Sequence, residues 1–167
     1  MDQAVLRSLA KWPDVPAVYG WLALDRRGNW LLKESGSGEF GRIGNAALRE
    51  FISRNYGADP RGCWYFQNGP QRVYVQLAYT PLVVHHEGDA LFDHCGRPVE
   101  AGETYVDDEG SVLVLGRSGI GLLDDRDLER YAAAAASLPR IARAEVAARF
   151  GFVSDPAVVG QFETSRD

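Results

Sequence analysis

Three short segments of this 167-residue sequence share one turn signature, in which Asp is followed three positions later by Gly, with apolar residues on both sides. The segments are LDRRGNWL (24–31), FDHCGRPV (92–99) and VDDEGSVL (106–113). Asp at the first turn position accepts hydrogen bonds from the backbone, and Gly takes the left-handed conformation that a three-residue hairpin loop requires. The signature therefore predicts antiparallel hairpins and restricts the chain to a fold rich in adjacent strands.

Runs of β-branched and aromatic residues surround these turns and predict strands. The runs are VYGWLAL (18–24), 30–33, CWYFQ (63–67), RVYVQLAYT (72–80), LVVHH (82–86), 90–93, 104–107 and 111–116. One helix is well marked at Asn45–Tyr56. Asn45 is a favourable N-cap residue, Gly57 suits the position after a helix end, and Pro60 cannot continue the helix.

Two more helices are expected to close the chain, at Asp124–Ser137 and Leu138–Phe150. Together with the strands they indicate an α+β fold, in which a meandering, mostly antiparallel sheet packs on one central helix and two helices lie at the C-terminus. At this length we expect a single domain over 1–167, with a β-rich part at about 17–116 and a helical part at about 124–163.

The composition excludes several classes of partner. The net charge of −5 disfavours nucleic acid, because phosphate binding requires clustered positive charge. No apolar run approaches the ~18 residues that a membrane span needs. The two cysteines, Cys63 and Cys95, do not form a disulfide framework and favour reduced thiols. These features predict a bacterial-type cytoplasmic protein with no membrane partner, and nothing in the sequence indicates a cofactor.

All three histidines lie in the segment HHEGDALFDHCGRPV (85–99), which is the strongest candidate for a metal site. A turn at 88–89 predicts that His85 pairs with Phe92 and His86 with Leu91. Adjacent residues of a strand point to opposite faces of a sheet, so His85 and His86 cannot bind one ion. Because zinc requires three or four converging ligands, the segment is interpreted as two β-turns without a metal site.

Cys95 is the candidate nucleophile of the same segment. A catalytic thiol needs a neighbouring base that lowers its pKa, and His94 is adjacent in the sequence. A turn seldom presses two consecutive side chains together, so we assign no catalytic residue here.

The segment Gly36-Ser-Gly-Glu-Phe-Gly41 spells the G-x-G-x-x-G pattern of dinucleotide-binding turns. The helix after it starts at Asn45, several residues past the last glycine, so no phosphate would lie at its N-terminus. We interpret residues 36–44 as a flexible loop. An alternative is that this loop approaches the 85–95 hairpins and covers a site there, which would make the protein a small enzyme or a ligand-binding domain.

The aromatic strands at 63–67 and 72–80 present the most distinctive surface. If Gln67 opposes Arg72, the side chains of Tyr65, Arg72 and Tyr74 share one face of the sheet. Tyrosine and arginine are enriched at recognition hot spots, so these three residues are the predicted binding residues. The alternatives are that a helix covers this face or that it is solvated.

The segment EVAARFGFVSDPAVVGQF (145–162) resembles the second half of the helix-turn-helix in regulators of the arabinose-operon type, through Ala147, Gly151 and the run 154–156. This resemblance implies DNA binding and makes a transcriptional accessory protein a further alternative. The second helix would present residues 157–161, of which only Gln161 could hydrogen-bond to a base edge. We therefore favour an apolar terminal helix that docks on the domain or on a partner subunit.

The runs WPDVPAVYGWLALDRRGNWLL (12–32) and NYGADPRGCWYFQNGPQRVYVQL (55–77) resemble a small family of uncharacterised proteobacterial proteins. The resemblance implies a bacterial cytosolic domain and transfers no catalytic residue. The leading prediction is a non-enzymatic binding or regulatory module. It would engage a protein partner, or a second copy of itself, through the face with Tyr65, Arg72 and Tyr74 or through the C-terminal helices.

Overall fold

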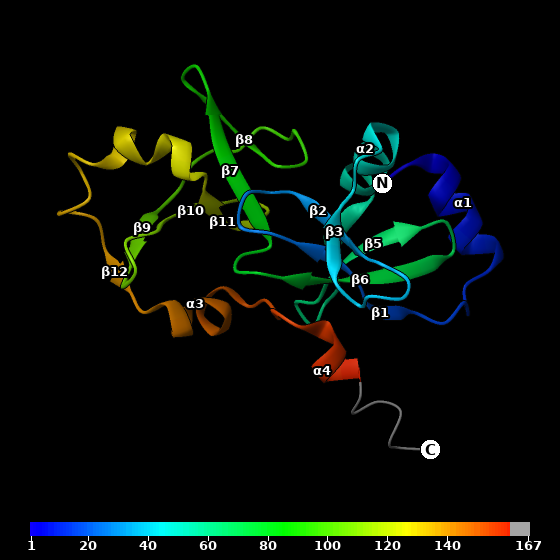
Figure 1. The fold of residues 1–167 in the computed structure, drawn as a ribbon. Helices are drawn as coiled ribbons and strands as arrows, with labels where there is room; N and C mark the ends of the chain where they lie inside the picture. Colours follow the sequence, from blue (N-terminus) through cyan, green and yellow to red (C-terminus); the bar gives the residue numbers. More distant parts are fainter. Residues whose placement is uncertain (161–167) are drawn as a thin grey trace. The chain divides into compact units, whose positions relative to one another are not determined.

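The computed structural model describes residues 1–160, which fall into two compact units (Figure 1). Unit 1 contains residues 1–25 and 29–78 together with residues 152–160. Unit 2 contains residues 26–28 and 79–151. The single domain expected over 1–167 stays a prediction.

Unit 1 is built on a six-stranded sheet with the order β3-β2-β1-β6-β5-β4. Its strands are β1 (Val18–Leu24), β2 (Trp30–Lys33), β3 (Phe40–Arg42), β4 (Tyr56–Ala58), β5 (Trp64–Asn68) and β6 (Gln71–Leu77). Its helices are α1 (Gln3–Lys11), α2 (Ala46–Arg54) and α4 (Pro156–Gly160). Strands β1 and β6 pair in parallel, whereas the other neighbouring strands of this sheet are antiparallel.

Helix α2 begins where the sequence predicts and ends earlier. The side chain of Asn45 accepts a hydrogen bond from the Leu48 backbone N–H over 3.0 Å, which confirms the predicted N-cap. At the other end, the buried Asn55 donates to the Phe51 carbonyl and accepts from the Asp2 backbone N–H. Asn55 thus stops the helix and ties the start of the chain to it, so that Gly57 belongs to strand β4.

Unit 2 contains a second six-stranded sheet, with the order β12-β9-β10-β11-β7-β8. Its strands are β7 (Leu82–Glu87), β8 (Ala90–Asp93), β9 (Thr104–Asp107), β10 (Val112–Gly116), β11 (Gly119–Leu123) and β12 (Arg140–Ile141). The 3-10 helix η1 (Asp125–Tyr131) and helix α3 (Arg143–Phe150) complete it. One face of this sheet carries the core cluster Val84, Leu91, Val106, Val112, Val114 and Leu123.

The α+β class is confirmed, but the prediction of one meandering sheet on one central helix is wrong. Two sheets are present, and both contain parallel pairs, which are β1 with β6 in the first and β7 with β11 and β9 with β12 in the second. Hairpin turns fix only the pairing of strands that are adjacent in sequence. A parallel pair joins strands separated by a long connection, so no local pattern specifies it.

The two predicted C-terminal helices are also corrected. Residues expected as a helix at Asp124–Ser137 form η1 followed by turns, because the Asp124 side chain caps the Arg126 backbone N–H and the Asp127 side chain accepts from the His86 backbone N–H. Residues expected as the start of the second helix form β12, since the Pro139 carbonyl accepts from the backbone N–H of Val106 and β12 pairs with β9.

Residues 56–75 of unit 1 and 104–123 of unit 2 trace the same path through their sheets. In each, an Asp-x-x-Gly turn joins the first two strands, a two-residue turn joins the second to the third, and the third strand pairs in parallel with an earlier one. Corresponding positions differ by 48 in residue number throughout, as Asp59 and Asp107 do. Residues at corresponding positions of the two units can therefore be compared directly.

Candidate functional site

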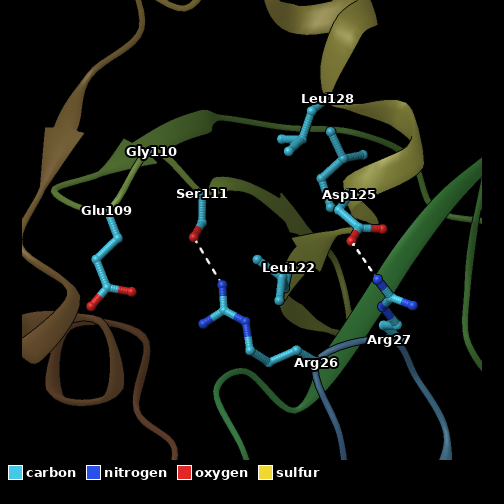
Figure 2. Close-up of a pocket in the computed structure, with 9 residues that line it drawn as sticks. Arg26, Arg27, Glu109, Gly110, Ser111, Leu122, Asp125 and Leu128 are labelled. Carbon is cyan, nitrogen blue, oxygen red and sulfur yellow. Dashed lines mark hydrogen bonds and ion pairs between the residues drawn. The ribbon is translucent and has the colours of Figure 1, made fainter.

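A pocket of about 360 Å³ opens in unit 2, beside the turn between β9 and β10 (Figure 2). Its volume lies at the lower end of the range for small-molecule sites. Arginine and acidic side chains form its rim, and leucines form one wall. The lining residues are Arg26, Arg27, Glu109, Gly110, Ser111, Leu122, Leu123, Asp125 and Leu128.

Arg26 is the central charged group of this pocket. Its Nη2 donates a hydrogen bond to the Ser111 hydroxyl over 3.0 Å, and its guanidinium carbon lies 5.2 Å from the centre of the Tyr79 ring. Figure 2 shows the Arg26 side chain extended toward Ser111. Within residues 1–160, no carboxylate lies within ion-pair distance of Arg26.

The neighbouring arginines differ from Arg26 because each has an acidic partner. Arg27 donates to Asp125 over 3.0 Å at the exposed rim, and Arg143 is paired with Glu109. Arg26 is therefore the lining arginine whose charge no ion pair offsets among residues 1–160.

The Asp107 turn holds Ser111 in position. One oxygen of the fully buried Asp107 carboxylate accepts hydrogen bonds from the backbone N–H groups of Glu109 and Ser111, and the other accepts from the Tyr79 hydroxyl over 2.7 Å. Burial raises the pKa of Tyr79 far above its ordinary value, and the hydrogen bond to Asp107 raises it further. The hydroxyl therefore stays protonated, and the ring under Arg26 and Arg143 is a fixed, neutral platform.

In unit 1 larger side chains stand at two of the positions that match this pocket. Tyr74 stands where unit 2 has Leu122, and its ring stacks on Tyr19 at 4.6 Å between ring centres. Arg61 stands where unit 2 has Glu109, and it donates to Asp59 and to the Tyr74 hydroxyl. The Tyr74 hydroxyl also donates to Asp59, as the Tyr79 hydroxyl donates to Asp107 in unit 2.

The histidines do not converge on one point. The predicted register is confirmed, with His85 opposite Phe92 and His86 opposite Leu91. His85 contacts Glu87 at 3.1 Å, whereas His86 contacts the Tyr131 hydroxyl at 3.0 Å. Across residues 1–160, no three His, Cys, Asp or Glu side chains are grouped so that they could hold a metal ion.

The expectation that a turn separates His94 from Cys95 is wrong. The Cys95 Sγ lies 3.6 Å from the Nε2 atom of His94. The other ring nitrogen, Nδ1, accepts a hydrogen bond from the Val83 backbone N–H over 3.2 Å, so a neutral His94 carries its proton on Nε2. This ring can donate to the sulfur but cannot remove its proton, which argues against a base-activated nucleophile.

Comparisons with known proteins add a family but no activity. A family model described as "Protein of unknown function (DUF2946)" matches residues 1–157. The chain belongs to this family. The resemblance of the sequence to an uncharacterised family is thereby confirmed. No curated protein matches this DUF2946 chain.

Two solved structures are similar to the DUF2946 chain. A DUF1285 family protein from Silicibacter pomeroyi DSS-3 has a TM-score of 0.50 at 18% identity and covers 73% of both chains. A DUF1285 family protein from Shewanella baltica OS155 has a TM-score of 0.49 at 14% identity, covering 67% of this chain and 90% of its own. At such identities the first similarity concerns the fold alone.

The predicted binding residues of the DUF2946 chain share one face, as expected, because Gln67 pairs with Arg72 and Tyr65 with Tyr74. Tyr65 and Tyr74 are buried, at 9% and 4% exposure, and Val153 from the C-terminal segment packs against them. Arg72 lies over the Tyr65 ring at 3.9 Å and is half-buried. The binding role of these three residues stays a prediction, and only the outer part of Arg72 is open to a partner among them.

The glycine-rich segment of the DUF2946 chain is a hairpin loop between β2 and β3 rather than a strand-to-helix turn. The Glu34 backbone N–H donates to the Glu39 carbonyl, which closes the loop around Gly36 and Gly38. The loop belongs to unit 1 and the 85–95 hairpins to unit 2, so the enzyme or ligand site expected between them stays a prediction.

The C-terminal segment of the DUF2946 chain turns at Gly151, which takes the left-handed conformation after α3. The five-residue helix α4 follows, and Tyr19 of β1 lies against Gly160. The Ser154 carbonyl accepts from the Leu77 backbone N–H at the end of β6. This docking within unit 1 agrees with the favoured interpretation, whereas Gln161 and Phe162 lie outside the described residues. No helix among residues 1–160 is long and apolar enough to cross a membrane.

Proposed function

We propose that this protein is a non-enzymatic binding module whose unit 2 pocket binds a small organic anion. The observation that carries the proposal is the Arg26 guanidinium, which lines a 360 Å³ pocket without a carboxylate partner among residues 1–160. A half-buried guanidinium loses part of its hydration, and an anionic ligand restores the missing interactions. The sequence predicted a binding module, and this proposal keeps that class while changing the kind of ligand.

Preorganisation of Arg26 supports the proposal. The Ser111 hydroxyl accepts a hydrogen bond from one N–H group of Arg26. The centre of the Tyr79 ring lies 5.2 Å from the guanidinium carbon. Both supports are themselves held by the buried Asp107 carboxylate. A charged group that is already oriented costs a ligand less ordering on binding, so a small ligand can reach useful affinity.

The protein-contact role remains a separate proposal. It relies on Arg72 and on the C-terminal segment of unit 1, and none of these residues lines the unit 2 pocket. A cytoplasmic location accords with both proposals, since Cys63 and Cys95 are thiols and reducing compartments preserve thiols.

The test is a titration of the full chain with a panel of anions, comprising phenylacetate, acetate, succinate, phenyl phosphate and inorganic phosphate. Isothermal titration calorimetry and amide chemical shifts report binding. The diagnostic variant is Arg26→Gln, and the matched control is Arg117→Gln, which removes an exposed arginine paired with Glu100 elsewhere in unit 2.

We expect at least one anion of the panel to bind the wild-type chain and the Arg117→Gln variant, and to lose at least about tenfold in affinity in Arg26→Gln. Absence of binding across the panel, or equal loss in both variants, would contradict the proposed function.

A further inference from the structure

On the basis of the anion-binding function proposed above, we infer that the ligand is a monocarboxylate with a compact, ring-sized apolar body. Phosphate esters and dicarboxylates are excluded from the preferred class. The charge of the pocket, its hydrogen-bond donors, its apolar wall and its volume all favour such a ligand.

The single arginine of the pocket without an ion pair suits one negative charge and disfavours two. Arg26 has no carboxylate partner among residues 1–160, while Glu109 and Asp125 at the rim are paired with Arg143 and Arg27. A second negative charge on the ligand would have no cation to pair with and would approach these rim carboxylates. Like charges a few ångströms apart near a protein surface repel each other. A dianionic phosphate ester therefore gains less than a monocarboxylate does.

The donors are arranged for one carboxylate group. The Ser111 hydroxyl accepts from Arg26 Nη2, and within the described chain its own proton has no acceptor. Arg26 and Ser111 therefore offer a guanidinium N–H and a hydroxyl O–H from adjacent positions on one rim. Two such donors suit the two oxygens of a carboxylate, and the charge on the guanidinium strengthens the pair of hydrogen bonds.

The apolar wall of the pocket favours a ligand with an apolar part. Leu122 and Leu123 are buried in β11, and Leu128 of η1 completes the wall on the side away from Arg26 (Figure 2). A ligand without an apolar body, such as acetate, would make no contact with this wall and gain no hydrophobic stabilisation. The ligand must therefore carry a hydrocarbon part next to its carboxylate.

The volume of the pocket indicates the size of that part. In unit 1 the Tyr74 side chain stands in place of Leu122 and its hydroxyl donates to Asp59, whereas in unit 2 the Tyr79 hydroxyl donates to the matching Asp107. The shorter Leu122 lines the pocket of about 360 Å³. A planar ring supplied by the ligand would pack against Leu122 within this volume.

Phenylacetate is the probe, and three ligands serve as comparisons. Phenyl phosphate keeps the ring and adds a charge, acetate keeps the carboxylate and removes the ring, and succinate replaces the ring with a second carboxylate. We expect phenylacetate to bind at least about tenfold tighter than each of the three, and this preference to disappear in Arg26→Gln.

A second variant tests the position of the ring. Leu122→Tyr places in unit 2 the residue that unit 1 has at the corresponding position, so its ring should fill the pocket and abolish phenylacetate binding. Thermal unfolding of this variant verifies that it folds, and if it does not, the ligand comparison with Arg26→Gln still decides.

The outcomes separate the two proposals. If phenyl phosphate, inorganic phosphate or succinate binds tightest and still depends on Arg26, the monocarboxylate class is wrong while the anion-binding function stands. If acetate binds as tightly as phenylacetate, the ring-sized body is wrong. If no anion binds, both proposals fail.

Discussion

The Tyr79 hydroxyl donates a hydrogen bond of 2.7 Å to the Asp107 carboxylate, and both residues are buried. Asp107 also accepts two backbone N–H groups of its own turn, so it connects the turn that carries Ser111 to the ring that lies under Arg26. One buried carboxylate therefore positions two walls of the pocket.

Removal of this hydroxyl should destabilise the protein. In Tyr79→Phe an oxygen of the buried Asp107 carboxylate loses its partner, and we expect the free energy of unfolding to fall by about 1–3 kcal/mol. Urea denaturation measures the change. The control is Tyr105→Phe, because Tyr105 donates to the exposed carboxylate of Glu103, which water can solvate instead. Similar losses in both variants would show that burial of Asp107 does not matter.

Acid should destabilise the protein partly through Asp124. A hydrogen bond from Arg126 lowers the pKa of this carboxyl from 3.8 to about 2. Because the folded pKa is the lower one, the ionised group stabilises the folded state above pH 3.8, and this contribution is lost as the pH falls through about 2.

The variant Asp124→Asn isolates that contribution, because Asn can still cap the Arg126 backbone N–H while carrying no charge. We expect the stability difference between wild type and variant to shrink between pH 4 and pH 2, as followed by thermal unfolding. A difference that does not change with pH in this range would contradict the role of Asp124.

Gly28 should not tolerate a side chain. Its φ of +78° lies in the left-handed region, and a Cβ added there would approach the His94 Cβ to 2.7 Å. His94 cannot easily move away, since its ring accepts from the Val83 backbone N–H. We expect Gly28→Ala to cost about 1–2 kcal/mol for the backbone and about 1–3 kcal/mol more for the clash.

Gly88→Ala is the matched control for this substitution. Gly88 also has a positive φ, +61°, but no atom lies within 4 Å of its added Cβ, so only the backbone cost of about 1–2 kcal/mol should appear. Chemical denaturation of both variants gives the comparison, and equal losses would refute the predicted clash.

Arg72 should stabilise unit 1 through its contact with Tyr65. The guanidinium lies 3.9 Å from the ring centre, and Arg72→Ala should lower the free energy of unfolding by about 0.5–1 kcal/mol. The exposed Gln76, on the same strand and face, provides the control as Gln76→Ala, which should change stability by less than about 0.5 kcal/mol. If neither variant changes stability, Arg72 is free to act in recognition alone.

Local patterns predicted several parts of the fold. Asp25, Asp93 and Asp107 form the predicted turns, each with a left-handed glycine three positions later. Asn45 caps its helix, and the registers of two hairpins are as predicted. A fourth turn, Asp59-Pro-Arg-Gly62, was missed, because Gly57 and Pro60 were interpreted as signals of a helix end.

The sequence by itself determined three Asp-x-x-Gly turns, most of the strands and the helix cap, because each depends on residues within about four positions of one another. It did not predict β3, β4, β11 or β12. Tertiary structure alone decided that β1 pairs with β6 and β7 with β11, and that Arg26 meets Ser111 and Tyr79. Arg26 and Tyr79, for example, are more than fifty positions apart in the sequence. No local propensity specifies a contact over such a separation. The pocket is therefore a property of the folded chain, since its donors and its apolar wall become neighbours only when the sheet of unit 2 forms.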